Sequence, residues 1–321
     1  MNSPIVTKIL KRIGEPNLVH VLTKELAGTE LNSVLLEVFS EMTSKLSPPL
    51  LLNRYQSNRF VKPSDLPVLE LKRMELDVLE LFNSLNFEPI ELSPVSVLGS
   101  CSVVATADQD KVLSALRGTE VLADATNSIA LHICDLKQRS KDLPNQPEMI
   151  SFSTVQRHVR TPQINIKGFT PHFKIGCLVT AGTDRGSYSF EKESLRQHIV
   201  AMKTLYLNYY KVDDVRFRFL CRNNGYDSSE RLAQQVKEFV VGKHPEVAIE
   251  VITKPEKEID YYKGIQYKAD IDVRGKTFEI GDGGFVDWTQ KILQNKKERM
   301  LSTGIGFDFM YRIMRGEIVG A

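Results

Sequence analysis

The residues near the C-terminus that could do chemistry begin with two glycines in the stretch LSTGIGFDFMYRIM, residues 301–314. Gly304 and Gly306 are two positions apart in an apolar run, and a helical-looking segment follows them. This pattern predicts a strand that turns tightly into a helix. Such a turn can hold a ligand against its backbone, and it can equally be an ordinary turn punctuated by glycine.

The cysteines and histidines do not form a site by spacing. The four cysteines are far apart without a C-x-x-C pair, and the six histidines do not cluster with them at ligand spacing, which argues against a zinc site. Each cysteine lies in or beside an apolar run, so we expect reduced core residues of an intracellular, cytoplasmic protein. They are Cys101, Cys134, Cys177 and Cys221.

Composition excludes several classes of function. The chain has 321 residues, of which 26% are charged and 42% hydrophobic, and its formal net charge is +2. A charge so near zero provides no bulk attraction to nucleic acid or to an anionic membrane. The first residues lack the long apolar region of a secretory signal, and no run of about 18 apolar residues would span a membrane.

The elements that would position a site begin after a helical N-terminal region. Ser3, Pro4 and Gly14 are cap signals for a first helix, and Thr29 is a candidate cap for the next. A proline-containing segment, KLSPPLLLNRYQSNRFVKPSDLP, is expected to end any helix and act as a linker. We therefore expect residues 1–65 to be an N-terminal helical region and linker, either a docking module or a plain structural extension.

From residue 66 onward the pattern mixes helices with hairpins. LELKRMELDVLELFNSLNF is a long amphipathic helix, KESLRQHIVAMKTLYLNYY and SSERLAQQVKEFVVG are further helices, and HFKIGCLVTAG, DVRFRFLCR and EVAIEVIT are strands. IQYKADIDVRGKTFEIG predicts a hairpin that turns at Arg274 and Gly275. This order predicts an α+β fold with a mainly antiparallel sheet flanked by helices.

Several segments carry a family resemblance. In chain order they are the long helix followed by FEPIELSPVS with Pro94, RGTEVLADATNSIALHI, QRHVRTPQINIKGFTPHFKIGCLVTAG, IDYYKGIQYKADI, EIGDGGFVDW and the glycine turn at 304–306. Together they resemble the catalytic core of the class II aminoacyl-tRNA synthetases over roughly residues 66–313. Within that family the segments are most similar to histidyl-tRNA synthetase and to its paralogue, the regulatory subunit of ATP phosphoribosyltransferase.

The resemblance implies a chemistry and a set of residues. The family activates a carboxylate by attack on the α-phosphate of ATP, so fixed cations must surround the phosphates, and ATP with Mg²⁺ is the implied cofactor. The implied catalytic residues are Arg157 and Lys257. The positions implied for ATP are Arg157, Arg160, Phe169, Asp308 and Arg312. The positions implied for an amino-acid-like substrate are Asp260, Tyr261, Tyr262, Gly264, Gly283, Gly284, Asp287, Gly304 and Gly306.

The sequence departs from the family pattern at the phosphate ligands. The segment QRHVRTPQINIKGFTPHFKIGCLVTAG resembles motif 2 of the family, and Val159 stands where that motif has glutamate. The glycine turn at 304–306 resembles motif 3, and Phe309 stands where that motif has arginine. A phenyl ring cannot make the forked bonds of a guanidinium, and removing one preorganised donor typically costs about 3–4 kcal/mol in the transition state. Arg312 lies one turn further on, with its Cα displaced by about 4.5 Å. Ala123 and Ala125 replace the arginine and glutamate of the family's histidine-binding turn.

The matching residues keep simpler interpretations open. Tyr261 and Tyr262 fit a pocket wall, and they also fit an aromatic pair of a sheet. The glycines can be required by backbone geometry alone, and Arg157 and Arg160 can be solvated surface cations. His158 and His172 are expected to be hydrogen-bonded loop residues. Asp260 and Asp287 are expected to fix the pocket through backbone hydrogen bonds.

These observations predict a paralogue of the class II core, residues 66–321, that binds an amino acid or a related small molecule in a regulatory or accessory role. Two alternatives are an ATP-dependent ligase that adenylates an amino acid for an acceptor other than tRNA, and a dimeric scaffold without a ligand. The resemblance implies a homodimer through motif 1. We expect no anticodon-binding domain, no binding of a whole tRNA and no membrane association, and we expect the N-terminal helices to be a possible contact for a protein partner.

Overall fold

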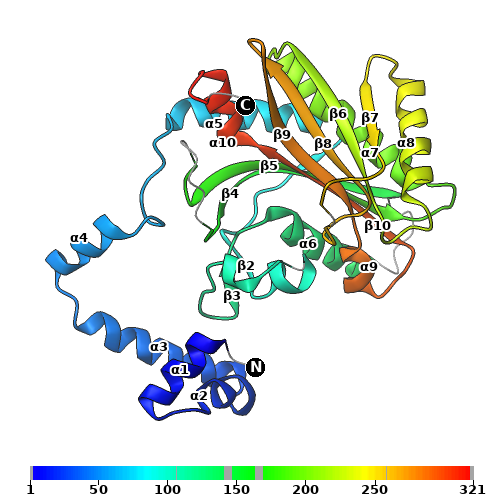
Figure 1. Cartoon of the computed structure of the whole chain (residues 1–321). Helices are drawn as coiled ribbons and strands as arrows, with labels where there is room; N and C mark the ends of the chain where they lie inside the picture. Colours follow the sequence, from blue (N-terminus) through cyan, green and yellow to red (C-terminus); the bar gives the residue numbers. More distant parts are fainter. Residues whose placement is uncertain (1–2, 106, 141–146, 163–168, 258, 319–321) are drawn as a thin grey trace.

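The structure is a computed structural model that describes residues 3–105, 107–140, 147–162, 169–257 and 259–318 (Figure 1). Its centre is an eight-stranded sheet in the order β1-β4-β5-β10-β9-β8-β6-β7. The strands of this sheet are β1 (Glu88–Pro89), β4 (Met149–Val159), β5 (His172–Thr183), β6 (Asp214–Arg222), β7 (Ala248–Ile252), β8 (Lys263–Val273), β9 (Lys276–Val286) and β10 (Glu298–Gly306). A small second sheet pairs β2 (Val95–Val97) with β3 (Thr119–Val121).

Strand pairing in the large sheet is antiparallel except at its two edges. β4, β5, β10, β9, β8 and β6 pair antiparallel, whereas β1 pairs parallel with β4 and β7 parallel with β6. The predicted hairpin turn joins β8 to β9, and Arg274 and Gly275 both have positive φ, at 53° and 74°. Two such residues are what a two-residue turn matched to strand twist requires. The prediction of an α+β fold with a mainly antiparallel sheet is confirmed.

Helices cover the two faces of the sheet unequally. One face carries the larger core, to which Phe82, Ile199 and Phe217 contribute. The helices in this core are α5 (Val68–Ser84), α7 (Ser189–Lys203), α8 (Ser229–Lys243) and α10 (Phe307–Met314). The opposite face is covered only in part, by α6 (Ala125–Arg139) and α9 (Trp288–Leu293), over a second core. Strand side chains alternate between faces, so the rest of this second face presents polar residues of β6, β8 and β9. The short helical turns η2 (Ser100–Val104) and η4 (Thr204–Tyr209) add buried residues to these cores, whereas η3 (Gln109–Lys111) has none.

The N-terminal helices lie outside the layers of the sheet and its helices (Figure 1). They are α1 (Pro4–Ile13), α2 (Leu18–His20), η1 (Val21–Glu25), α3 (Gly28–Ser44) and α4 (Pro48–Ser57). The predicted caps of α1 are confirmed, because the Ser3 side chain accepts from Val6 N and Gly14 ends the helix in a left-handed conformation. Thr29 was expected to cap α3, but the helix begins at Gly28 with Ala27 as its N-cap residue.

The proline-containing segment differs from expectation. It was predicted to end any helix and act as a linker, yet α4 occupies Pro48–Ser57, because Ser47 caps it and proline is tolerated in the first turn, where the N–H has no helical partner. Residues 88–98 contain the two short strands β1 and β2, with Pro94 between them. In the part of the chain that the structure describes, no helix is both long and apolar enough to cross a membrane.

Residues 59–65, which follow α4, run back onto the sheet body, and we call them the strap. The Arg59 side chain donates to the carbonyl oxygen of Thr161. His172 Nε2 lies 2.6 Å from the carbonyl oxygen of Lys62, and Asp65 pairs with Arg312 of α10. The strap therefore joins the N-terminal helices to β5 and α10.

Candidate functional site

A cavity of about 880 Å³ lies on the partly covered face of the sheet. β9 and β10 contribute Asp282, Ser302 and Gly304 to its lining, and the segment before β8 contributes Tyr261 and Tyr262. Other walls come from β4 and β5, from the start of α6 and from the strap residue Arg59. The size suits a small molecule, since ligand pockets typically span about 300–1,000 Å³.

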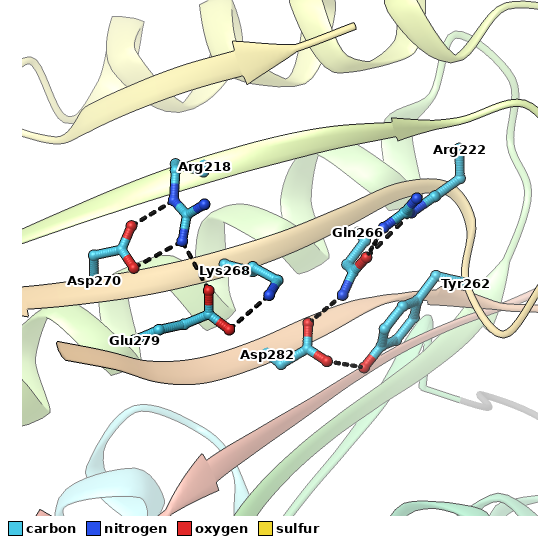
Figure 2. Close-up of polar contacts among 8 residues, drawn as sticks. All are labelled: Arg218, Arg222, Tyr262, Gln266, Lys268, Asp270, Glu279 and Asp282. Atoms are coloured by element: carbon cyan, nitrogen blue, oxygen red, sulfur yellow. Dashed lines mark hydrogen bonds and ion pairs between the residues drawn. The ribbon is translucent and has the colours of Figure 1, made fainter. Parts of the chain in front are cut away.

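A carboxylate stands in the cavity between two donors. Asp282 Oδ1 accepts from Gln266 Nε2 at 2.6 Å, and its Oδ2 accepts from the Tyr262 hydroxyl at 3.2 Å (Figure 2). The Gln266 amide is held in turn by Arg222, whose Nε donates to Gln266 Oε1 at 3.1 Å. Burial raises the pKa of the Asp282 carboxyl above its ordinary value. The Gln266 amide, held in place by Arg222, therefore donates in a fixed direction to the Asp282 carboxylate, which has lost part of its hydration.

Neighbouring charges on the same face of the sheet are paired with one another. Arg218 of β6 binds Asp270 and Glu279, and Lys268 binds Glu279 at 2.6 Å (Figure 2). Arg222 on this face donates to Gln266 and to the carbonyl oxygen of Lys257. The basic side chains on the strands beside Asp282 are therefore bound to acceptors other than Asp282. Within the described residues, Asp282 itself forms no ion pair.

Aromatic rings form one wall of the cavity. The rings of Tyr261 and Tyr262 meet edge to face with centroids 4.7 Å apart, and Trp288 lies 5.4 Å from Tyr261 in the same geometry. The Tyr261 hydroxyl donates to Asp124 Oδ2 at 3.0 Å. Asp124 Oδ1 caps α6 by accepting from Thr126 N, so the wall is anchored to the start of that helix.

Hydrogen-bond donors lie on the β4 side of the cavity. His158 is fully buried, and its Nε2 accepts from the backbone N–H of Ala125 at 3.0 Å. Burial lowers the pKa of His158 to about 4, so the ring is neutral at pH 7 and Nδ1 carries the proton. Among the described residues that Nδ1 has no hydrogen-bond partner. Arg160 Nε donates to the Ala123 carbonyl oxygen, and its guanidinium lies over the Phe173 ring.

Basic side chains beside the cavity, among them Arg157 and Arg312 that were expected at a phosphate, are engaged by other groups of the chain. Arg157 donates to His172 Nδ1 at 2.8 Å. Arg312 is bound by Asp65 of the strap and by Glu317. Lys174 is bound by Glu75 of α5. These basic side chains are not part of the cavity lining.

Asp308 lies at the start of α10, beside these cations. Its Oδ2 accepts from the backbone N–H of Lys174 at 3.1 Å, and burial raises the pKa of its carboxyl. Phe309, the next residue, packs its ring on Phe169 with centroids 5.5 Å apart. An apolar ring contact thus stands where a motif 3 arginine would be.

The structure distributes the predicted site residues over three places. Those that line the cavity are Arg160, Phe169, Tyr261, Tyr262, Gly304 and Gly306. Those engaged beside it are Arg157, Asp308 and Arg312. The remaining predicted residues do not line the cavity. Lys257 is exposed, Asp260 binds Lys263 and Asn224, and Asp287 binds Lys291. Gly283 and Gly284 lie within the sheet, and Gly264 has a positive φ of 65° beside Tyr226.

Sequence reasoning missed Asp282, Gln266 and Arg222, which come from three adjacent strands. The available signal was an acid between glycines in an otherwise apolar strand, EIGDGGFV. Asp124 was also missed, although an aspartate followed by a helical pattern is a recognisable cap.

Comparisons with known proteins identify the fold. No protein-family model and no curated protein matches the chain. Among solved structures, the chain is similar to apo histidyl-tRNA synthetase from S. aureus, with a TM-score of 0.59 and 13% identity over 80% of this chain and 69% of that one. The chain is also similar to a putative threonyl-tRNA synthetase, ThrRS-1, from Aeropyrum pernix, with a TM-score of 0.60 and 11% identity over 77% of this chain and 60% of that one. An ATP phosphoribosyltransferase regulatory subunit/histidyl-tRNA synthetase from Bacillus halodurans C is similar with a TM-score of 0.55 and 12% identity, over 80% of this chain and 83% of that one.

These neighbours share the class II aminoacyl-tRNA synthetase fold, and so does this chain. The resemblance found in the sequence is thereby confirmed for the fold. At 11–13% identity the likeness carries no residue roles, so the function must be argued from the cavity.

Proposed function

We propose that this chain binds an amino acid or a related small molecule in the cavity, acts in a regulatory or accessory role, and does not charge tRNA. The observation that carries the proposal is the contrast between the cavity and the basic side chains beside it. The cavity has an aromatic wall, a carboxylate and the donors Arg160 and His158, whereas Arg157 and Arg312 beside it are bound by other groups of the chain and do not line it.

ATP with Mg²⁺ is the cofactor that the fold implies, and the residues at the phosphate end fit it poorly. Phe309 offers no hydrogen bond to a phosphate, and its ring is packed on Phe169. Arg312 would have to leave both Asp65 and Glu317 before it could bind a phosphate. Breaking ion pairs of this kind opposes the binding energy that a triphosphate would provide.

A ligase that adenylates an amino acid for a non-tRNA acceptor is the second candidate. It is favoured by the cations that do line the cavity, Arg59, Lys111 and Arg160. In this reaction Arg157 would turn from His172 to the α-phosphate, so Arg157→Ala would abolish turnover. Full turnover in that variant would exclude the ligase as proposed.

The test combines two measurements on the full chain. Pyrophosphate exchange with ATP is measured against a panel of amino acids, and thermal unfolding is measured with the same panel. We expect no exchange, together with a rise in Tm for one or a few amino acids. Exchange with one of them would replace the proposal by the ligase, and absence of both signals would leave a scaffold without a ligand.

A matched pair of variants locates the binding. Tyr262→Phe removes the hydroxyl bonded to Asp282, whereas Tyr209→Phe removes a hydroxyl bonded to Asp77, outside the cavity. We expect only Tyr262→Phe to weaken the Tm response. Equal responses in both variants would place the ligand elsewhere.

We also propose that the chain forms a homodimer and that the N-terminal helices contact a protein partner. Val68 and Leu69 of α5 are 63% and 70% exposed, and Phe39 and Met42 of α3 are 49% and 56% exposed. Exposed apolar residues of this kind are typical of protein contacts. Light scattering of the purified chain tests the dimer, and a monomer at micromolar concentration would contradict it. The free thiols of the buried cysteines favour a reducing compartment such as the cytoplasm.

A further inference from the structure

We infer that Asp282 forms a subsite that binds a positively charged group of the ligand, an ammonium or a guanidinium, through a charge-assisted hydrogen bond. The inference rests on the proposed function, because it requires a small molecule in the cavity. Beyond the proposed function, it specifies the charge of the ligand group that faces the sheet.

The first step is the unused bonding capacity of the carboxylate. An ionised carboxylate offers about four lone-pair positions to donors. Asp282 receives Gln266 Nε2 on one oxygen and the Tyr262 hydroxyl on the other. Asp282 lines the cavity, so its carboxylate lies within reach of a ligand there.

The second step is the lack of an ion-pair partner for Asp282 among the described residues. Lys268 lies near Asp282 but is bound to Glu279, and Lys263 is bound to Asp260. The two donors that Asp282 does have are an amide and a phenol, which carry no charge. Even a partly buried carboxylate is costly unless it is paired, so a cationic ligand group supplies the ion pair that Asp282 does not form among the described residues.

The third step is the opposite polarity of another cavity wall. Nδ1 of the buried His158 is a donor without a partner among the described residues, and Arg160 lines the same cavity. Both groups favour an acceptor or an anion. A ligand with a cation and a carboxylate, such as an amino acid, matches a cavity that has an acid on one wall and donors on another.

The test uses pairs of probes that differ in one charge. L-Lysine is compared with L-norleucine, and L-arginine with L-citrulline, by titration calorimetry on the full chain at pH 8. Nα-acetyl-L-lysine is added because it lacks the α-ammonium and keeps the side-chain cation. Tighter binding of L-lysine than of L-norleucine identifies a side-chain cation in the subsite, and weaker binding of Nα-acetyl-L-lysine than of L-lysine identifies the α-ammonium.

The variants are Asp282→Asn and a control, Asp272→Asn. Both remove one negative charge from the same face of the sheet, but Asp272 is bound by Arg216 and lies outside the cavity lining. We expect Asp282→Asn to raise the Kd of the cationic probe by about tenfold or more, and the control to leave this Kd unchanged. Circular dichroism confirms that both variants are folded.

Two results would overturn the inference. If probes bind and Asp282→Asn changes no Kd, the cavity holds a ligand but Asp282 does not recognise its charge, and the proposed function stands. If neither the charged nor the uncharged probes bind to the unmodified chain, the inference fails together with binding of amino acids of this class.

Discussion

Gly284 of β9 supports the wall of the cavity, and replacing it tests that role directly. A Cβ at this position would lie 2.6 Å from the Ile265 carbonyl oxygen and 2.6 Å from Cδ1 of Tyr262. The carbonyl belongs to the paired strand β8 and cannot move alone. In Gly284→Ala the Tyr262 ring therefore has to shift, together with the backbone near it.

The cost follows from these two contacts. Overpacking a tightly packed interior typically costs about 1–3 kcal/mol. If the Tyr262 hydroxyl also leaves Asp282, a bond to a charged group worth about 1.5–3 kcal/mol is weakened or lost. With both costs, we expect Gly284→Ala to lower the free energy of unfolding by about 2.5–6 kcal/mol, a large part of the roughly 5–15 kcal/mol typical of a folded chain.

The assay is urea unfolding followed by tryptophan fluorescence. The sequence contains one tryptophan, Trp288, which is 2% exposed and packs on Tyr261, so its emission reports on this wall. Gly242→Ala is the matched control, because Gly242 is an exposed residue of α8 with open space around its would-be Cβ. Alanine there is expected to stabilise by about 0.5–1 kcal/mol. A Gly284→Ala variant within about 0.5 kcal/mol of the unmodified chain would refute the packing argument.

Three further predictions concern charge and burial. The pKa of Asp282 is raised by burial, so the native state binds that proton more tightly than the unfolded state, and ionisation costs stability as pH rises. Asp282→Asn should thus be more stable than the unmodified chain in urea at pH 8, and the difference should shrink as pH falls toward 4; a constant difference would contradict this. Asp65→Asn should cost about 1 kcal/mol or less, because Asp65 is 63% exposed and Arg312 keeps Glu317, yet it should speed amide exchange in the strap; unchanged exchange would show that the strap is held by its other bonds. Burial raises the pKa of every cysteine thiol, so the native chain should not react with a thiol reagent at pH 8. The unfolded chain should consume one equivalent of the reagent for each of Cys101, Cys134, Cys177 and Cys221.

The sequence could predict those parts of the fold that local patterns determine. The apolar periodicity predicted α5, and Arg274-Gly275 predicted the β8–β9 turn, because both depend on residues close in the chain. The Tyr261-Tyr262 pair was also found, since its spacing is a contiguous motif. Asp282 was missed because its environment is set by strand register, which places Gln266 opposite Gly284 and Arg222 on the strand beyond. Whether Arg157 and Arg312 are free depended on Lys62 and Asp65, residues so distant in sequence that no local pattern connects them.

The strap has a thermodynamic consequence for the whole chain. Arg59 lines the cavity, and Lys62 and Asp65 in the same short segment contact His172 and Arg312. A molecule that pulls the N-terminal helices into a new position must therefore break or remake contacts at the edge of the cavity. By linkage, the effect is reciprocal: any free energy with which such a partner alters ligand affinity equals the free energy with which the ligand alters affinity for the partner. The connection between α4 and the sheet is thus a route by which occupancy of the cavity can be read out at the N-terminal helices.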